Sequence, residues 1–218
     1  MTNKDFIESL VEEHREWRIS KLALIKKIYI KLKTKDEKKF FLQSSIPTIY
    51  SIWEGFVKSI LKSLLKFLDT KNIQPSNISQ ELLVWSLSEK IKNLKQSEDF
   101  KKQMKHSQIL LAELDKKVKF SKIKIDTKSN LNNRVLKELC VNFGIFNIED
   151  FFSKDELDEL FRLVDIRNKL SHGEENAIII ESLDDIQKYI VLVIKLMDNW
   201  ISLIDNFLLN EKFLLKNN

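Results

Sequence analysis

The sequence predicts an all-α fold, a bundle of long antiparallel helices, and two observations support this. Its 218 residues include only 3 Gly and 2 Pro, so residues that favour tight turns are scarce. Hydrophobic residues make up 43% of the chain, and over most of its length they recur at the three- and four-residue spacing of a helix face. No internal repeat or low-complexity segment divides it. We therefore expect a single domain over residues 1–218, with residues 72–130 as an elaborating insert.

The apolar periodicity predicts a series of helices, over about residues 5–33, 38–68, 77–93, 98–116, 131–143, 154–172 and 182–209. Pro47 falls inside the second of these. Proline removes one helical hydrogen bond and clashes with the preceding turn, so a kink or a restart is expected there. Asn77 with Gln80 makes a plausible capping box for the third helix.

Cap signals are clearer in the last third of the chain. Ser153 with Glu156 has the spacing of a capping box, and Ser182 with Asp185 opens the final helix. Gly173 lies just past the last periodic residue of the helix that begins near residue 154, where a left-handed residue commonly ends a helix.

Two segments have the pattern of strands instead. Within residues 118–126, Ile123 and Ile125 alternate with lysines, as in a half-buried strand. Residues 177–181 form the only other β-branched run. The two are candidates for one short β-ribbon, which would place a lysine-rich edge beside His172.

Composition excludes several functional classes. One cysteine, Cys140, rules out an internal disulfide framework and a cysteine-based zinc site. The three histidines have no ligand-like spacing, so we expect no metal and no cofactor. No apolar run approaches the length of a membrane span and the N-terminus lacks the apolar core of a signal peptide, so we expect a cytoplasmic protein without membrane contact. A net charge of +5 favours nucleic acid as partner.

Two charges fall where apolar residues belong. Glu54 lies on the apolar stripe of the second helix, and Arg167 takes an inward position on the helix that follows Ser153. Because a buried lone charge costs several kcal/mol, the two suggest a pair. The pair is either structural, or half-exposed at helix edges, or it fixes the guanidinium so that its remaining donors face a phosphate. Gly55 would permit the close helix crossing that brings Glu54 to Arg167.

The segment from Arg167 to Gly173 carries the candidate chemistry. Asn168 and His172 are one turn apart on an ideal helix. A histidine can take the proton of a ribose 2′-hydroxyl, while an arginine stabilises charge growing on phosphorus. A short Arg-Asn…His string also arises by chance, and His172 could serve merely as a helix cap. Because one histidine cannot act as base and acid at once, two copies facing each other across a twofold axis are attractive.

The segment RNKLSHG, residues 167–173, resembles the signature of HEPN domains, an Arg, a polar residue and a His after four to six positions. Residues 46–58, IPTIYSIWEGFVK, are similar to the second helix of a HEPN branch found in prokaryotic defence and toxin systems, and residues 127–131, TKSNL, are also similar to that branch. The resemblance implies a helical bundle, a homodimer that joins the two motifs in one cleft, and metal-independent RNA cleavage.

By the same resemblance, Arg167 and His172 match the catalytic pair, Asn168 the polar residue beside it, and Glu54 an acid that supports the site. Some HEPN toxins carry a tyrosine two residues after the histidine, which a partner nucleotidyltransferase modifies. Glu174 occupies that position here, which puts regulation by that route in doubt.

Basic and polar residues near these motifs are candidates for holding RNA, unless they form only a solvated lysine face. They are Lys169, Lys122, Lys124, Lys128, Asn130 and Arg134. The sequence thus predicts a HEPN-like endoribonuclease that acts as a toxin or phage-defence effector, dimeric through the face carrying Arg167 and His172, with an antitoxin or defence-system protein as further partner. The alternative is a non-catalytic HEPN module that binds RNA, nucleotide or a partner protein.

Overall fold

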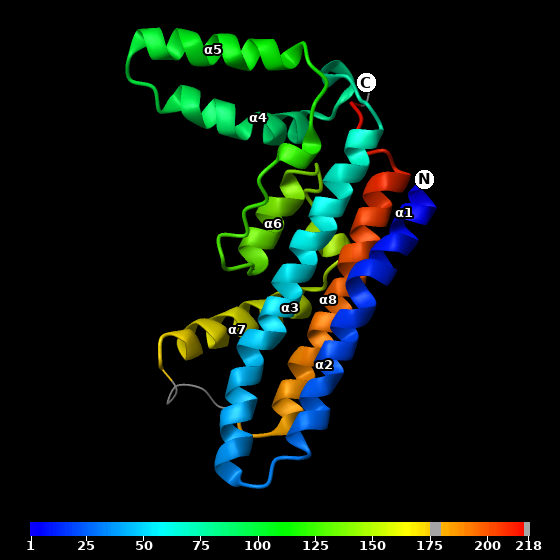
Figure 1. The fold of residues 1–218 in the computed structure, drawn as a ribbon, viewed down its shortest axis with the longest axis vertical. Helices are drawn as coiled ribbons and strands as arrows, with labels where there is room; N and C mark the ends of the chain where they lie inside the picture. The colour runs from blue at the N-terminus through cyan, green and yellow to red at the C-terminus, as the bar shows by residue number, and fades with distance from the viewer. Residues whose placement is uncertain (175–179, 216–218) are drawn as a thin grey trace.

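The computed structural model describes residues 1–174 and 180–215, and within them the predicted all-α fold is confirmed (Figure 1). Long helices lie side by side along the molecule's longest axis, with a helical hairpin projecting at one end. The α-helices are α1 (Asn3–Leu10), α2 (Glu16–Tyr29), α3 (Lys35–Thr70), α4 (Gln80–Lys95), α5 (Phe100–Leu114), α6 (Asn133–Val141), α7 (Lys154–Ser171) and α8 (Leu183–Leu209).

Helix α3 is the centre of the bundle, and it packs against α2, α7 and α8. A capping box between Thr34 and Glu37 starts it. One helix continues through Pro47 to Thr70, so the expected restart at the proline does not occur. Ile46 and Ile49 on either side of the proline are fully buried, so both halves are held against the same core despite the lost hydrogen bond.

The first helical segment is shorter than the predicted 5–33 and contains a π-helical turn. This turn, Val11–Arg15, joins α1 to α2 and puts one wide turn into an otherwise continuous helix. At its end the guanidinium of Arg15 donates from Nε to Oδ1 of Asp198 over 2.6 Å, which ties the turn to α8. The N-terminal segment from α1 to α2 thus packs against both α3 and α8.

Helices α4 and α5 form the hairpin that stands away from the bundle in Figure 1. Helix α5 has no buried residue and packs on α4. The predicted cap at Asn77 is wrong, because Pro75–Asn77 forms a 3₁₀ turn and α4 begins at Gln80 after Ser79. The proline at the first position of that turn favours its local backbone geometry.

The predicted β-ribbon does not form in the described residues. Residues 118–126 contain a 3₁₀ turn, Phe120–Lys122, and no strand, while residues 177–179 lie outside the described residues. The carboxylate of Asp69 accepts from the backbone N–H of Phe120 (2.6 Å) and of Ser121 (3.3 Å). Because α3 supplies these acceptors and Phe120 is buried, the turn in this segment has backbone partners without a second strand.

The caps of the last two helices are confirmed. Ser153 with Glu156 and Ser182 with Asp185 form complete capping boxes at the starts of α7 and α8. Helix α7 crosses α3 and packs on it and on α8, so its end is carried to the side of the bundle (Figure 1). Across residues 1–174 and 180–215, no helix combines the length and apolar character needed to span a bilayer.

Candidate active site

Arg167 lies half-buried near the end of α7, against α3. Its guanidinium carbon is 4.9 Å from the centre of the Tyr50 ring, a cation–π arrangement. Its Nη1 donates to Oδ1 of Asn168 over 2.9 Å. No ion pair joins Arg167 to an acid in the described part of the chain. The guanidinium therefore has a fixed position and donors that remain available to an anion.

Asn168 connects Arg167 to the loop before α6. Its amide Nδ2 donates to Oδ1 of Asn130, at 3.4 Å. Next to Asn130, the backbone N–H of Leu131 donates to the hydroxyl of Tyr50 over 2.6 Å. The Tyr50 side chain thus contacts the Arg167 guanidinium with its ring and binds the loop through its hydroxyl oxygen. Burial raises the pKa of this phenol to about 12, so it is a neutral acceptor at ordinary pH.

The loop of residues 126–132 is held in an unusual backbone conformation. Lys128 and Ser129 have φ of 54° and 52°, the left-handed region that non-glycine residues rarely adopt. Asp126 accepts the Lys128 backbone N–H over 2.8 Å. Thr127 is 1% exposed and donates from Oγ1 to Oε1 of Glu54 over 2.5 Å. These contacts fasten the strained loop to α3.

The direct ion pair between Glu54 and Arg167 does not form. The carboxylate of Glu54, with 15% of the side chain exposed, is paired instead with Lys58 one turn along α3, at 3.0 Å. Together with the Thr127 hydroxyl, this partner compensates for its desolvation, so Glu54 needs no second helix for a counter-charge. Glu54 is therefore linked to Arg167 indirectly, through the loop with Asn130 and Asn168 and through Tyr50, whose ring contacts the guanidinium.

Gly55 also faces a different neighbour from the one expected. A Cβ at Gly55 would meet Nη2 of Arg18, on α2, at 3.9 Å. The crossing at Gly55 is therefore with α2 and not with α7. Arg18 is 5% exposed and donates to the hydroxyl of Ser59 over 3.1 Å.

His172 is the last residue associated with α7. Its backbone N–H donates to the carbonyl oxygens of Asn168 and Lys169, both at 3.1 Å. Gly173 follows with φ +77° and its N–H bonds to Leu170 O, while the N–H of Glu174 bonds to Lys169 O. These two bonds make a Schellman ending. The His172 side chain is exposed and forms no hydrogen bond within the described residues, so the helix end is capped by backbone alone.

The predicted RNA-binding residues are not all equally available. Lys169 is paired with Asp165 at 2.8 Å, a contact that raises the pKa of the lysine. Lys128 and Arg134 both pair with Glu138, and the hydrogen bond from Lys128 lowers the pKa of that carboxylate. Lys122 and Lys124 are exposed on the segment before the loop. No ion pair with a described acid involves either of them.

Tyr50, Thr127 and Lys58 lie in the family-like segments 46–58 and 127–131, but the sequence did not assign a site role to any of them. Tyr50, Glu54 and Lys58 follow one another at four-residue intervals on α3, so they share one ridge of the helix. That spacing was the available signal for Lys58. Nothing in the sequence indicates that Thr127 reaches α3, because this contact spans residues far apart in the chain.

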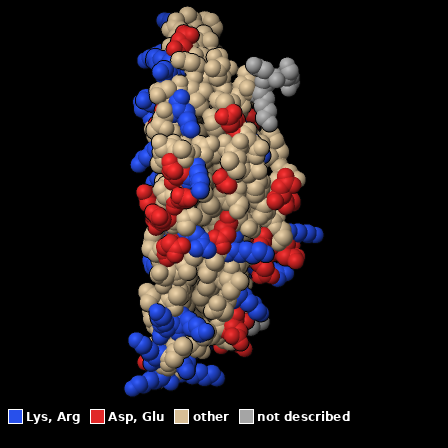
Figure 2. All heavy atoms as spheres, turned by 90° about the vertical axis from the view of Figure 1, so that its right-hand side faces the viewer, with Lys and Arg blue, Asp and Glu red and all other residues tan. Residues whose placement is uncertain are grey.

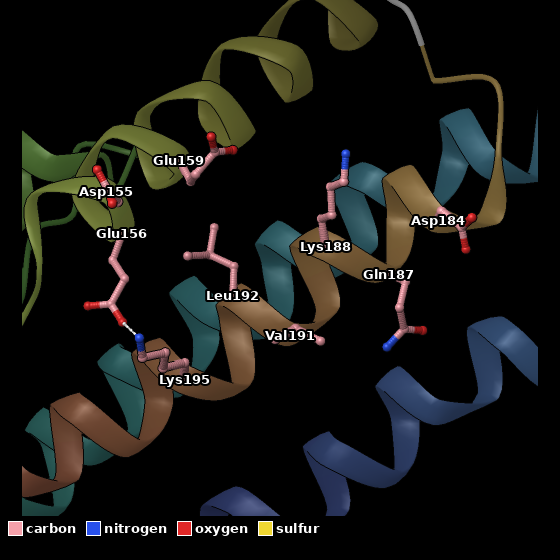
Figure 3. Close-up of a pocket in the computed structure, with 9 residues that line it drawn as sticks. All are labelled: Asp155, Glu156, Glu159, Asp184, Gln187, Lys188, Val191, Leu192 and Lys195. Atoms are coloured by element: carbon pink, nitrogen blue, oxygen red, sulfur yellow. Dashed lines mark ion pairs between the residues drawn. The ribbon is translucent and has the colours of Figure 1, made fainter.

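A cavity of about 550 Å³ lies elsewhere, between α7 and α8 (Figure 3). Leu192 and Val191 of α8 form its apolar side, and an ion pair between Glu156 and Lys195, at 2.7 Å, crosses one end. None of the predicted site residues lines it. The face of the molecule in Figure 2 interleaves acidic and basic side chains, with basic ones gathered at its lower end.

The fold and the RN…H arrangement at the end of α7 define a helical-bundle protein with a composite polar site. A family model described as HEPN_MAE_28990-like HEPN matches residues 7–213. The chain therefore belongs to this HEPN family, as the RNKLSHG segment and the helix around Trp53 indicated. No curated protein and no solved structure matches the chain.

Proposed function

We propose that this protein is a metal-independent endoribonuclease, acting as a toxin or phage-defence effector. The observation that carries the proposal is the end of α7. There Arg167 has no acidic partner in the described residues, and the His172 side chain is left unused by the helix cap. A guanidinium and an imidazole on successive turns are groups that can cleave a phosphodiester without a metal ion.

The reaction follows from these two groups. The His172 imidazole removes the proton of a ribose 2′-hydroxyl, whose oxygen attacks the adjacent phosphorus. The bond from phosphorus to the 5′-oxygen breaks, and that oxygen leaves with a proton from an acid. The products are a 2′,3′-cyclic phosphate and a 5′-hydroxyl. Arg167 and Asn168 hold the phosphate and stabilise its transition-state charge. Among the described residues, no group of three or more potential metal ligands is clustered.

The second proton transfer supports a dimer. Each chain has His172 as its only histidine near Arg167, since His14 bonds Ser63 and His106 lies on α5. An isologous dimer through the face carrying Arg167 and His172 brings a second imidazole to the same phosphate. In this arrangement one His172 acts as base and the partner's His172 as acid. An antitoxin or defence-system protein that covers this face would block both catalytic histidines and so inhibit cleavage.

Glu54 has a positioning role in the proposal. It holds Thr127, and the loop that contains Thr127 presents Asn130 to Asn168. Lys169, Lys122 and Lys124 contribute positive charge around the substrate. Lys128 and Arg134 hold the loop through their ion pairs with Glu138, and Asn130 holds it through its hydrogen bond with Asn168.

The test is incubation of labelled single-stranded RNA with the full chain in EDTA, comparing wild type, His172→Ala and the control His106→Ala. We expect cleavage by wild type and by the control, and a loss of at least 100-fold in His172→Ala with an unchanged circular dichroism spectrum. Wild-type cleavage by His172→Ala would overturn the assignment. RNA binding without any cleavage would favour the non-catalytic HEPN module.

A further inference from the structure

Three lysines continue the ridge of α3 that begins at the candidate site. Lys58, Lys62 and Lys66 follow Glu54 at four-residue intervals. Such residues are ~6 Å apart along the axis and form an inclined row on the helix surface. Like charges at this spacing repel one another and weaken a helix. The row therefore has a cost in the free protein that a bound anion would remove.

A fourth lysine faces the same space. A pocket of about 460 Å³ lies between α3 and the segment before the 126–132 loop, and Lys58, Lys62, Lys66, Lys124 and Ser121 are among its lining residues. No carboxylate lines it. Lys58 is paired with Glu54, whereas Lys62, Lys66 and Lys124 form no ion pair with an acid in the described residues. The pocket is thus a concave surface of one sign of charge, which concentrates anions.

The far wall of the pocket is held in place by α3 itself. Asp69, one turn beyond Leu65, accepts the backbone N–H groups of Phe120 and Ser121. Phe120 is 1% exposed. Its burial anchors the turn that precedes Lys124, so the pocket has a fixed shape and its fourth lysine is not on a free tail.

We propose that this pocket binds the backbone phosphates of the RNA strand that enters the candidate active site, an inference that rests on the proposed function. The ridge connects the two places. Tyr50 carries Arg167, Glu54 holds the loop, and Lys58 to Lys66 line the pocket. From residue 50 to residue 66 the helix rises ~24 Å at 1.5 Å per residue. A strand that follows the ridge therefore has several phosphates within reach of lysine.

The lining also defines what the pocket recognises. Lysine is a flexible point charge that suits phosphate oxygens. No aromatic side chain lines the pocket, so bases have no stacking platform there. We infer contacts that position the strand without reading its sequence, and an affinity that depends strongly on salt.

The experiment uses the His172→Ala protein, so that binding is measured without cleavage. The pocket variant is Lys62→Glu, Lys66→Glu and Lys124→Glu together. The matched control changes three exposed lysines of α5 in the same way, at Lys101, Lys102 and Lys105. Both variants change net charge equally. The probe is a labelled 12-nucleotide single-stranded RNA, followed by fluorescence anisotropy at several salt concentrations.

The pocket variant is expected to weaken binding at least 10-fold, and to reduce the slope of log K against log salt by about 2, as loss of three phosphate contacts on a single strand implies. The control is expected to change the Kd less than 3-fold. Equal losses in both variants, no loss in either, or no RNA binding at all would overturn the proposal. If the glutamates disturb folding, Lys62, Lys66 and Lys124 are changed to glutamine instead. This glutamine variant must also bind RNA more weakly than the α5 control.

The two proposals fail separately. If the wild type cleaves RNA and the pocket variant binds RNA as tightly as its parent, only the phosphate-pocket proposal is wrong. RNA binding that depends on the pocket, in a protein that does not cleave RNA, would remove the nuclease proposal and leave the pocket.

Discussion

The guanidinium of Arg167 lies 4.9 Å from the centre of the Tyr50 ring. This contact joins α7 to α3, and the tyrosine hydroxyl joins α3 to the loop that reaches Asn168. The candidate site is therefore positioned by an aromatic ring and a chain of hydrogen bonds. Arg167 keeps its charge uncompensated by the described acids, which is what phosphate binding requires of it.

Arg167→Lys tests the guanidinium geometry. Lysine keeps the charge but not the planar fork that bonds Asn168 and a phosphate together. The cleavage rate is expected to fall by roughly 100-fold, the effect of removing one oriented donor to a transition-state oxygen. Arg162→Lys is the control, because Arg162 lies on the same helix and, within the described residues, forms an ion pair with Glu159 alone. Equal rates for the two variants would contradict this role.

Tyr50→Phe tests the neutral phenol. In the unfolded chain the phenol ionises near pH 10, and in the folded protein only near its raised pKa of about 12. The contribution of the neutral phenol to the free energy of unfolding is therefore fully present below pH 10, and it is lost as the pH rises toward 12. At pH 8 the variant should be less stable by about 1–3 kcal/mol, because the Leu131 N–H loses its acceptor. In urea unfolding, that difference should shrink steadily above pH 10. A difference that stays constant to pH 11.5 would argue against this pKa.

Thr127→Val tests the link from Glu54 to the loop. Valine keeps the buried volume and removes the hydroxyl that bonds Glu54. We expect a loss of about 1–2 kcal/mol in the free energy of unfolding. The kcat should also fall with little change in KM, since Asn130 and Asn168 lose their fixed position. Thr127→Ser should restore both quantities, and a serine variant as impaired as valine would show that the hydroxyl is not what matters.

Gly173→Ala tests the end of α7. Among the described residues, no atom lies within 4 Å of the position that a Cβ at Gly173 would take, but φ of +77° strains any L-residue with a side chain. A loss of ~1 kcal/mol in thermal or urea unfolding is expected, together with slower cleavage, because the ending that presents His172 is disturbed. Gly55→Ala is the counterpart. It lies inside α3 with only a 3.9 Å contact, so alanine there should be neutral or stabilising. The reverse order of stabilities would contradict the assignment of the helix end.

Much of the fold follows from local signals in the sequence. The capping boxes at Ser153 and Ser182 need only residues three apart, and they were correctly predicted. The lysine-rich alternation around Ile123 failed as a strand signal, because the segment begins with a turn whose Phe120 and Ser121 N–H groups bind the carboxylate of Asp69, distant in sequence. Pro47 does not restart the helix, because packing on both sides outweighs one missing hydrogen bond.

The site was predictable only in part. The charges of Glu54 and Arg167 stood out from their own helices, but their partners depend on tertiary contacts. Glu54 pairs with Lys58 and accepts a hydrogen bond from Thr127, and Arg167 packs on the ring of Tyr50. A pattern on a single helix shows that a charge is misplaced, and it does not show which of several neighbours compensates it.

The proposed reaction depends on activation of the ribose 2′-hydroxyl at the scissile bond by His172. Its most direct test is to map the cleavage site in an RNA oligonucleotide, replace the 2′-hydroxyl there by hydrogen, and identify the product ends in EDTA. We expect 2′,3′-cyclic phosphate and 5′-hydroxyl ends from the all-RNA strand, and no cleavage at the deoxy position. Cleavage at that position, or products with 3′-hydroxyl and 5′-phosphate ends, would contradict it.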